Sequence, residues 1–102
     1  MVNPIGAINQ CQGGVIDGIG TAMYGGIKIE NGRSTSDNFN SYRMIRMNET
    51  PEVEIHFVES QVAPTGLGEP PLPPAAPAVA NAIYAALNKR ITKFPMHKQL
   101  KA

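Results

Sequence analysis

The amino-acid sequence predicts an α+β fold in which two helices pack on a small, mostly antiparallel sheet. Apolar residues recur at the three- and four-residue spacing of a helix over about residues 9–24 and 75–88. Residues 27–30 and 53–57 instead alternate apolar with polar side chains, as half-buried strands do. An Asn-Gly pair at positions 31–32 follows the first alternating run and is the strongest short signal for a hairpin turn.

The first predicted helix contains four glycines between positions 13 and 20, each costing roughly 1 kcal/mol relative to alanine in a helix interior. A helix that keeps such residues usually has a packing reason. Gly14 and Gly18 are four residues apart and share one face, which lets another backbone approach closely. We therefore expect this helix to be buried.

The second predicted helix is alanine-rich and carries one apolar stripe at four-residue spacing, formed by Val79, Ile83 and Leu87. The small residues around that stripe suit close packing, and Asn88 is expected to end the helix. The basic tail from Lys89 is expected to end loosely.

The remaining extended segments complete the predicted sheet. Residues 33–35 are expected to return from the hairpin turn, and residues 42–47 to add a further extended stretch. The clearest strand is 53–57, whose odd positions are all apolar. His56 lies on the polar face of that strand and is expected to face solvent.

Composition excludes several classes of function for these 102 residues. The formal net charge is +1, from nine Lys and Arg against eight Asp and Glu, which gives no field for nucleic acid or an anionic membrane. The single cysteine cannot form an intramolecular disulfide. No stretch approaches the roughly 18 apolar residues of a membrane span.

Common cofactor and metal motifs are absent from the pattern. A dinucleotide fingerprint requires Gly-x-Gly-x-x-Gly after a strand, whereas Met23 stands at the third glycine's place, inside a helical run. A P-loop requires Lys-Ser or Lys-Thr, which the glycine-rich stretch lacks. Cys11 has no Cys or His at ligand spacing, and His56 and His97 are far apart, so no metal ligand is assigned. Cys11 is expected to be a small packed residue.

Residues 63–74 cannot form regular structure because prolines and glycines dominate them. Glu69 stands in the middle, in the run Gly66-Leu67-Gly68-Glu69-Pro70-Pro71. A carboxylate held in such a loop can serve as a general base, or it can be an ordinary surface acid. A third reading takes the Pro-x-x-Pro register of residues 71–74 as a polyproline ligand, which predicts an exposed, mobile segment.

This run, continued by the alanine-rich helix, resembles the C-terminal signature of the molybdopterin-binding large subunit of molybdenum hydroxylases. That family includes xanthine dehydrogenase and aldehyde oxidase. The amino-acid sequence of this run is most similar to that of the isoquinoline 1-oxidoreductase-like branch. The upstream order agrees: Asn3-Pro4 precedes a Gln-x-x-Gly-Gly helix that begins at Gln10. The resemblance covers nearly the whole chain.

The resemblance implies a set of residue roles. Glu69 corresponds to the family's catalytic base, which takes a proton while a water-derived oxygen enters a C–H bond of an N-heterocycle or aldehyde. Gln10 corresponds to a glutamine that touches the molybdopterin cofactor, and Gly13 and Gly14 let the helix approach the cofactor region. The molybdenum is held by the pterin, so no residue here needs to be a metal ligand.

The resemblance also implies that residues 1–102 are a C-terminal part of a molybdopterin-binding domain, inactive alone, as a fragment or a small subunit. Its partners are then the rest of the molybdopterin-binding subunit, an iron–sulfur subunit and a small-molecule substrate. The alternative is a non-catalytic, stand-alone interaction or structural module. Cytoplasm and periplasm both fit the sequence.

Overall fold

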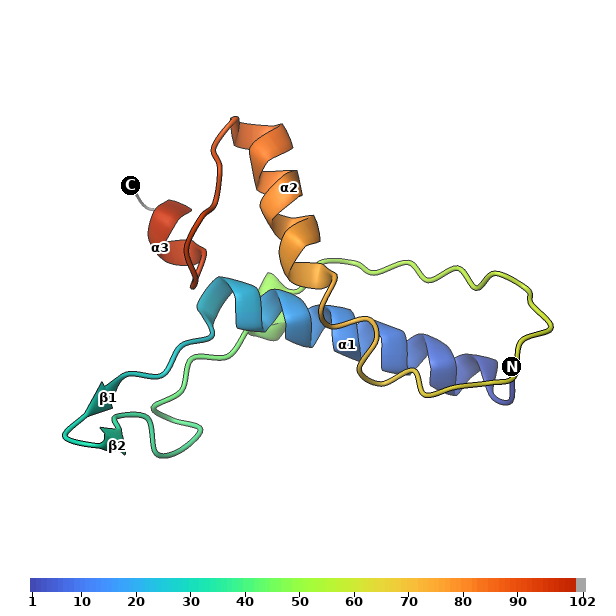
Figure 1. The fold of residues 1–102 in the computed structure, drawn as a ribbon, viewed down its shortest axis with the longest axis horizontal. Coiled ribbons are helices and arrows are strands. Elements are labelled where there is room, and N and C mark those ends of the chain that lie inside the picture. Colours follow the sequence, from blue (N-terminus) through green and yellow to red (C-terminus); the bar gives the residue numbers. More distant parts are fainter. Residues whose placement is uncertain (101–102) are drawn as a thin grey trace.

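Helix α1 (Pro4–Tyr24) is the longest element of the chain, and the other elements lie around it (Figure 1). The structure is a computed structural model that describes residues 1–100. In chain order the further elements are β1 (Ile29–Glu30), β2 (Arg33–Ser34), the 3₁₀ turn η1 (Met47–Glu49), α2 (Ala75–Leu87) and α3 (His97–Leu100). The described chain is therefore mostly helical, with one two-stranded antiparallel sheet.

Helix α1 begins five residues earlier than the apolar spacing predicts. The side chain of Asn3 accepts a hydrogen bond from the Gly6 N–H at 3.0 Å, and Pro4 occupies the first helical position. Asparagine is a preferred N-cap, and proline fits the first turn because its missing N–H would have had no helical partner. The Asn-Pro pair thus starts the helix.

Helix α2 meets α1 where α1 has no side chain. A Cβ atom added to Gly18 would lie 2.6 Å from the Leu72 carbonyl oxygen and 2.7 Å from the Ala75 Cβ. Ala75, the first residue of α2, is buried in this contact. The predicted close approach of a second backbone to the glycine face is therefore confirmed, and α2 keeps its predicted span and ends at Asn88 with φ of 52°.

The C-terminal tail caps the end of α1 instead of ending loosely. The backbone N–H of Met96 donates to the Ala22 carbonyl at 3.0 Å, and Met96 is fully buried. The Nδ1 atom of His97 lies 2.6 Å from the Met23 carbonyl oxygen, and because a carbonyl only accepts, that nitrogen carries the hydrogen. Two carbonyls that a helix end leaves without partners are thus satisfied by the tail.

The sheet is much smaller than predicted, and neither helix packs on it. The turn forms at Asn31 and Gly32, with φ of 50° and 75°, so the hairpin prediction is confirmed. Its strands have two residues each and project away from the helices on an arm (Figure 1). The predicted packing of helices on a sheet is wrong because the hairpin buries neither face.

Neither the stretch 42–47, which was expected to be extended, nor the strand predicted at 53–57 forms a strand within the described residues. The first segment instead leads into η1, and the second runs as an unpaired trace through a long irregular stretch (Figure 1). A strand requires a hydrogen-bonded neighbour, and no described segment lies beside 53–57 in register. The alternation is present in the sequence, but residues 1–100 offer no strand that pairs with it.

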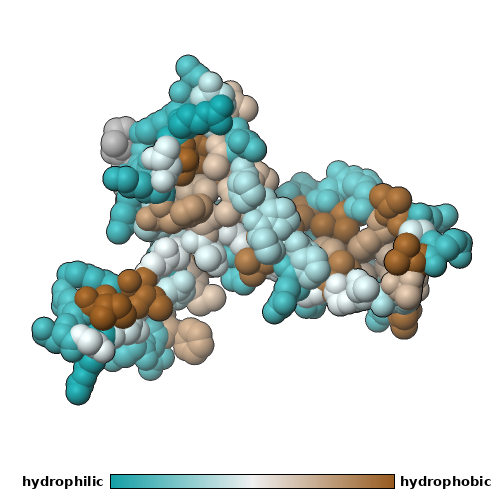
Figure 2. All heavy atoms as spheres, viewed as in Figure 1, coloured by the Kyte–Doolittle hydropathy of each residue, from teal (hydrophilic) through white to brown (hydrophobic). Residues whose placement is uncertain are grey.

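The chain exposes far more surface than a self-contained domain of its size. Its accessible surface is 8029 Å², against about 5,600 Å² for a folded monomer of this mass. Its radius of gyration is 16.3 Å, against about 13 Å for a compact domain of this length. Figure 2 shows hydrophobic side chains on the hairpin arm and around the N-terminal end of α1. The buried apolar side chains among residues 1–100 are Cys11, Ala22, Ala75 and Met96.

None of the helices within residues 1–100 is long and apolar enough to cross a membrane. The predicted burial of Cys11 is confirmed, since only 7% of the residue is exposed. His56 is exposed as expected, and its side chain pairs with that of Glu54 at 2.8 Å.

The glycine face of α1 makes a direct prediction about stability. Gly18→Ala should destabilise the fold by about 1–3 kcal/mol. The new methyl group would clash with backbone atoms of Leu72, which can move only if the loop shifts. Gly13→Ala is the matched control: its Cβ would meet no atom within 4 Å, so the variant should gain up to about 1 kcal/mol of helix propensity. Thermal unfolding of the purified variants measures both effects, and equal shifts would contradict the packing described.

Candidate functional site

The loop that carries Glu69 lies along the glycine face of α1. A Cβ atom on Gly68 would lie 2.8 Å from the side-chain nitrogen of Gln10. A Cβ atom on Gly14 would lie 3.2 Å from the Gly68 carbonyl oxygen and 3.2 Å from the Pro71 Cβ. The loop therefore runs along one face of α1 and contacts it once per helical turn, at Gln10, Gly14 and Gly18.

Glu69 itself is held by its backbone and presents its side chain outward. Its carbonyl oxygen accepts a hydrogen bond from the Leu72 N–H at 3.0 Å, which closes a turn. The residue is exposed, and its carboxylate has no hydrogen-bond or ion-pair partner among residues 1–100. The arrangement thus places an unpaired carboxylate on a loop whose flanks are fixed against α1.

The four residues singled out from the sequence divide into two groups. Gln10 and Gly14 contact the loop that carries Glu69, so the structure brings these three positions together. Gly13 lies on the neighbouring flank of α1, where an added Cβ would meet no atom within 4 Å. The flank at Gly13 is therefore open, and the exposed amide of Gln10 stands one helical turn before it.

The polyproline-ligand interpretation does not fit this packing. Pro71 and Leu72 are half-buried, and the Pro71 ring and the Leu72 carbonyl lie against the glycine face of α1. A segment recognised by an aromatic groove would need to be solvated and accessible. Among residues 1–100, no group of three or more His, Cys, Asp or Glu side chains could hold a metal ion.

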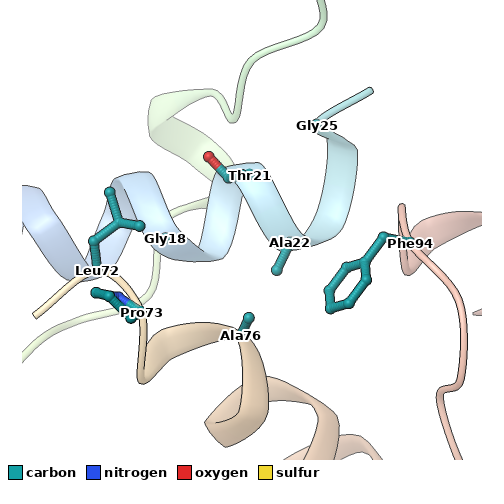
Figure 3. A pocket seen from close by; sticks show the side chains of 8 residues that line it. All are labelled: Gly18, Thr21, Ala22, Gly25, Leu72, Pro73, Ala76 and Phe94. Carbon is teal, nitrogen blue, oxygen red and sulfur yellow. The ribbon is translucent and has the colours of Figure 1, made fainter. Parts of the chain in front are cut away.

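A cavity of about 320 Å³ lies between the end of α1 and the start of α2 (Figure 3), and Glu69 is not among the residues that line it. Its lining is Gly18, Thr21, Ala22, Gly25, Leu72, Pro73, Ala76 and Phe94. The ring of Phe94 points into it between Ala22 and Ala76 (Figure 3). No lining residue titrates, so this cavity offers no group for acid–base chemistry, and the candidate site remains the α1–loop contact.

A cluster around Glu49 is the feature that sequence reasoning missed. Its carboxylate accepts hydrogen bonds from the Tyr24 hydroxyl at 2.8 Å and from the Arg46 N–H at 2.8 Å, and pairs with Arg43 at 2.6 Å. The Arg43 guanidinium also lies 4.2 Å from the Tyr24 ring centroid, and the His97 ring lies 5.3 Å from it. These contacts tie the loop before η1 and the C-terminal tail to the end of α1, over sequence separations that no local pattern reveals.

The cluster shifts two pKa values in opposite directions. The hydrogen bond from the Arg46 N–H, followed by that from Tyr24, holds the pKa of Glu49 below its ordinary 4.5. The hydrogen bond to Glu49, followed by burial, raises the pKa of Tyr24 above its ordinary 10.0. The folded chain thus favours a charged Glu49 and a neutral Tyr24.

Comparison with known proteins identifies the family. Residues 1–51, half of the chain, match the profile of the molybdopterin cofactor-binding domain family. The chain belongs to this family. The matched part contains the whole of α1, with Gln10, Gly13 and Gly14, and ends before the loop of Glu69.

Relatives of this molybdopterin cofactor-binding segment are much longer. The chain is 35% identical over 96 residues to the membrane-bound aldehyde dehydrogenase [pyrroloquinoline-quinone] of Gluconacetobacter polyoxogenes, covering 94% of this chain and 12% of that protein. It is 34% identical to the putative xanthine dehydrogenase molybdenum-binding subunit of Escherichia coli, covering 94% of this chain and 14% of the relative.

The isoquinoline branch expected from the sequence is among these relatives but is not singled out. Isoquinoline 1-oxidoreductase subunit beta of Brevundimonas diminuta is 30% identical over 91 residues, covering 89% of this chain and 12% of the subunit. This is a lower identity than that to the aldehyde dehydrogenase. The chain therefore spans 12–14% of the length of the relatives compared here.

One solved structure shares the fold. A chain of the Cu,Mo-CO dehydrogenase, in its carbon monoxide reduced state, superposes with a TM-score of 0.73 at 24% identity. The match covers 95% of this chain and 14% of that chain. The open arrangement of the molybdopterin cofactor-binding segment is thus also found as a small part of a much longer polypeptide.

The Glu49 cluster predicts how stability changes with pH. Because the folded state lowers the pKa of Glu49, its contribution is fully present above pH 4.5 and is lost as pH falls further. Because the folded state raises the pKa of Tyr24, its contribution is present below pH 10.0 and is lost as pH rises further. In thermal unfolding, the difference between wild type and Glu49→Gln should be largest near neutral pH and shrink in acid. A difference that is constant with pH would contradict the assignment.

Proposed function

We propose that the chain is the C-terminal part of the molybdopterin-binding large subunit of a molybdenum hydroxylase-type oxidoreductase, and that Glu69 is its general base. On this proposal residues 1–102 form one part of a domain that further polypeptide completes. The family match supports a role at the cofactor, and the residues around Glu69 resemble the family's catalytic loop.

The observation that carries this proposal is the contact between Gln10 and Gly68. It joins a helix that belongs to a molybdopterin cofactor-binding family to the loop of an unpaired carboxylate. Glu69 follows Gly68 directly, and the Gly68 carbonyl oxygen also lies 3.2 Å from the position of a Gly14 Cβ, so the main chain next to Glu69 packs against α1. A general base has to be held within hydrogen-bond reach of the group that it deprotonates. A loop packed on α1 can hold the Glu69 carboxylate in this way.

The open flank of α1 fits a cofactor that is held by hydrogen bonds and by close backbone approach. The exposed amide of Gln10 can donate and accept hydrogen bonds, and Gly13 leaves room where a side chain would stand. When bound, the molybdenum cofactor accepts the electrons released on substrate oxidation. Glu69 takes up a proton at its carboxylate oxygen, and the surrounding polypeptide excludes water from the reacting groups.

The substrate class that we propose is an aldehyde or a nitrogen heterocycle. The names of the relatives include an aldehyde dehydrogenase, an isoquinoline 1-oxidoreductase and a nicotinate dehydrogenase. We also propose an iron–sulfur subunit as the partner that removes electrons, as the family resemblance implies. Because the name of the aldehyde dehydrogenase relative includes pyrroloquinoline quinone, the experiment below also measures which cofactor the complete subunit contains.

The alternative of a stand-alone interaction module requires a fold that covers its own apolar surface. The chain does not do this: Phe39 is 81% exposed, and Met47 and Val58 are each 93% exposed. An exposed apolar surface of this extent marks a surface that is covered in the assembled protein. The exposure therefore favours a segment of a larger subunit over an independent module.

Glu69→Gln in the complete subunit should abolish turnover and leave the molybdenum and pterin contents unchanged. The amide keeps the shape and the hydrogen-bonding capacity of the side chain but cannot take up the proton, and loss of general-base catalysis alone costs about 10²–10⁴-fold. Steady-state turnover and metal analysis measure the two properties separately.

Glu30→Gln is the matched control for that experiment, because Glu30 lies on the hairpin arm and pairs with Lys28. It should retain turnover within about twofold, as surface substitutions usually do. Normal turnover by Glu69→Gln would remove Glu69 from the mechanism. A complete subunit that contains a quinone and no molybdopterin would overturn the proposed cofactor.

Gln10→Ala should lower the pterin content of the complete subunit without preventing its assembly. The substitution removes the exposed amide that lies against Gly68, next to the open flank at Gly13, and leaves a good helix former in its place. Asn9→Ala is the matched control, since Asn9 is an exposed neighbour on the same helix. Pterin released from equal amounts of each purified subunit is the measurement, and equal contents in both variants would exclude Gln10 as a cofactor contact.

A further inference from the structure

The segment from Glu52 to Val58 has the sequence of a strand and no strand beside it. Its apolar residues alternate with polar ones, and Val53 and Ile55 are half-buried whereas Glu54 is exposed. Throughout residues 51–68, no backbone group forms a hydrogen bond with the backbone of any residue that the structure describes. A run of this length normally finds partners for its N–H and C=O groups.

One edge of this segment already faces α1. The side-chain nitrogen of Gln12 donates a hydrogen bond to the Val53 carbonyl oxygen at 3.0 Å. A hollow of about 500 Å³ separates the helix from the segment, and its lining is Ile8, Gln12, Glu52, Val53, Glu54 and Ile55. The segment therefore rests on α1 at one point and is held away from it elsewhere.

The opposite edge of the segment is open. In an extended chain the N–H and C=O of one residue point to the same edge, and those of the next residue point to the other edge. The Val53 carbonyl marks the edge toward α1, so the backbone groups of Glu54 and His56 lie along the other edge. Such an edge is a template for pairing with another strand, and proteins do not leave one with apolar neighbours uncovered.

We infer that residues 52–58 form an open β-edge that pairs with a β-strand from the remaining polypeptide of the subunit. The inference rests on the proposal that the chain is a segment of a larger subunit. The choice of partner follows from length, since the chain spans only 8–14% of the relatives named above and 14% of the similar solved chain. Strand addition supplies hydrogen bonds along the open edge and covers the apolar face at Val53 and Ile55.

The open β-edge would also help to position the candidate site. It leans on α1 through Gln12, which lies two residues after Gln10 on the same helix, and the Glu69 loop packs on Gln10. A strand of the remaining subunit that pairs with the far edge of 52–58 is therefore linked, through this segment, to the same helix that contacts the loop of Glu69. Strand pairing thereby fixes the position of the surrounding polypeptide relative to the loop of the proposed base, Glu69.

Hydrogen exchange in the complete subunit tests the pairing. The amides of Glu54 and His56, which lie on the open edge, should exchange at least about 100-fold more slowly in the complete subunit than in this chain alone, as the amides of paired strands do. Residues 59–66, which lack the alternation, are the internal control and should stay fast. Equal, fast exchange of both sets of amides in a complete subunit that holds molybdenum would overturn the open β-edge and leave the proposed function standing.

His56→Pro tests the same edge by assembly. It removes one N–H on the open side and breaks no backbone hydrogen bond among residues 1–100, so it should weaken assembly of the complete subunit by about tenfold or more. Both this variant and the control below lose the side-chain pair with Glu54, so that pair does not separate them. His56→Ala is the matched control, since it keeps the N–H and should assemble normally. Equal assembly of the two variants would overturn the inference.

Two further results of these experiments would contradict the inference, one by showing a different partner for the edge and one by contradicting the proposed function. Protection of 52–58 in the chain alone, growing with concentration, would assign the edge to a second copy and overturn the assignment to the remaining subunit. Failure of the wild-type chain to enter any molybdenum-holding subunit would overturn the proposed function and this inference together.

Discussion

The approach of the 68–75 backbone to the side-chain-free face of α1 is the contact on which the rest of the chain depends. Gly14 and Gly18 leave the helix surface flat, and the Leu72 carbonyl oxygen lies where a Gly18 Cβ would clash, at 2.6 Å from it. Each glycine costs helix stability, and the close packing of two backbones compensates for that cost. Because this contact is made by main-chain atoms, it fixes both the start of α2 and the loop of Glu69.

A second constraint is the small hydrophobic core of the chain. The buried apolar side chains of residues 1–100 are few and small, apart from Met96, and the accessible surface is well above that of a compact monomer. The contacts that hold the periphery are accordingly polar: the Glu49 cluster at the end of α1, the tail that caps its carbonyls, and the single bond from Gln12 to Val53. Such contacts orient segments, but they do not supply the burial that stabilises a domain.

These two constraints explain why the molybdopterin cofactor-binding family uses this segment as a small part of a long polypeptide. The α1–loop contact is complete within the chain, and the surfaces around it are unfinished. The hairpin arm, the 51–68 stretch and the open flank at Gly13 all present groups that another part of the protein can cover. The segment therefore combines one close contact between backbones with surfaces that remain exposed.

Local patterns were sufficient where the cause of the structure is local. The alanine-rich helix, its end at Asn88 and the turn at Asn31 and Gly32 follow from propensity and from the left-handed conformation that these residues tolerate. The glycine spacing on α1 also predicted a close backbone contact. The start of α1 was missed because Asn3-Pro4 is compatible with both a turn and a helix cap, and only the observed hydrogen bond to Gly6 distinguishes them.

The sequence by itself determined the two long helices, the face of α1 that is free of side chains, and the place of Glu69 in a loop stiffened by prolines. Only the tertiary structure decided that this loop packs on Gln10 and Gly14, that the tail caps α1, and that Tyr24, Arg43 and Glu49 meet. The reason is that alternation and spacing report which surface an element can bury, whereas the partner that buries it lies far away in the chain. For residues 53–57 the predicted strand has no such partner within residues 1–100, and the pattern alone could not reveal this.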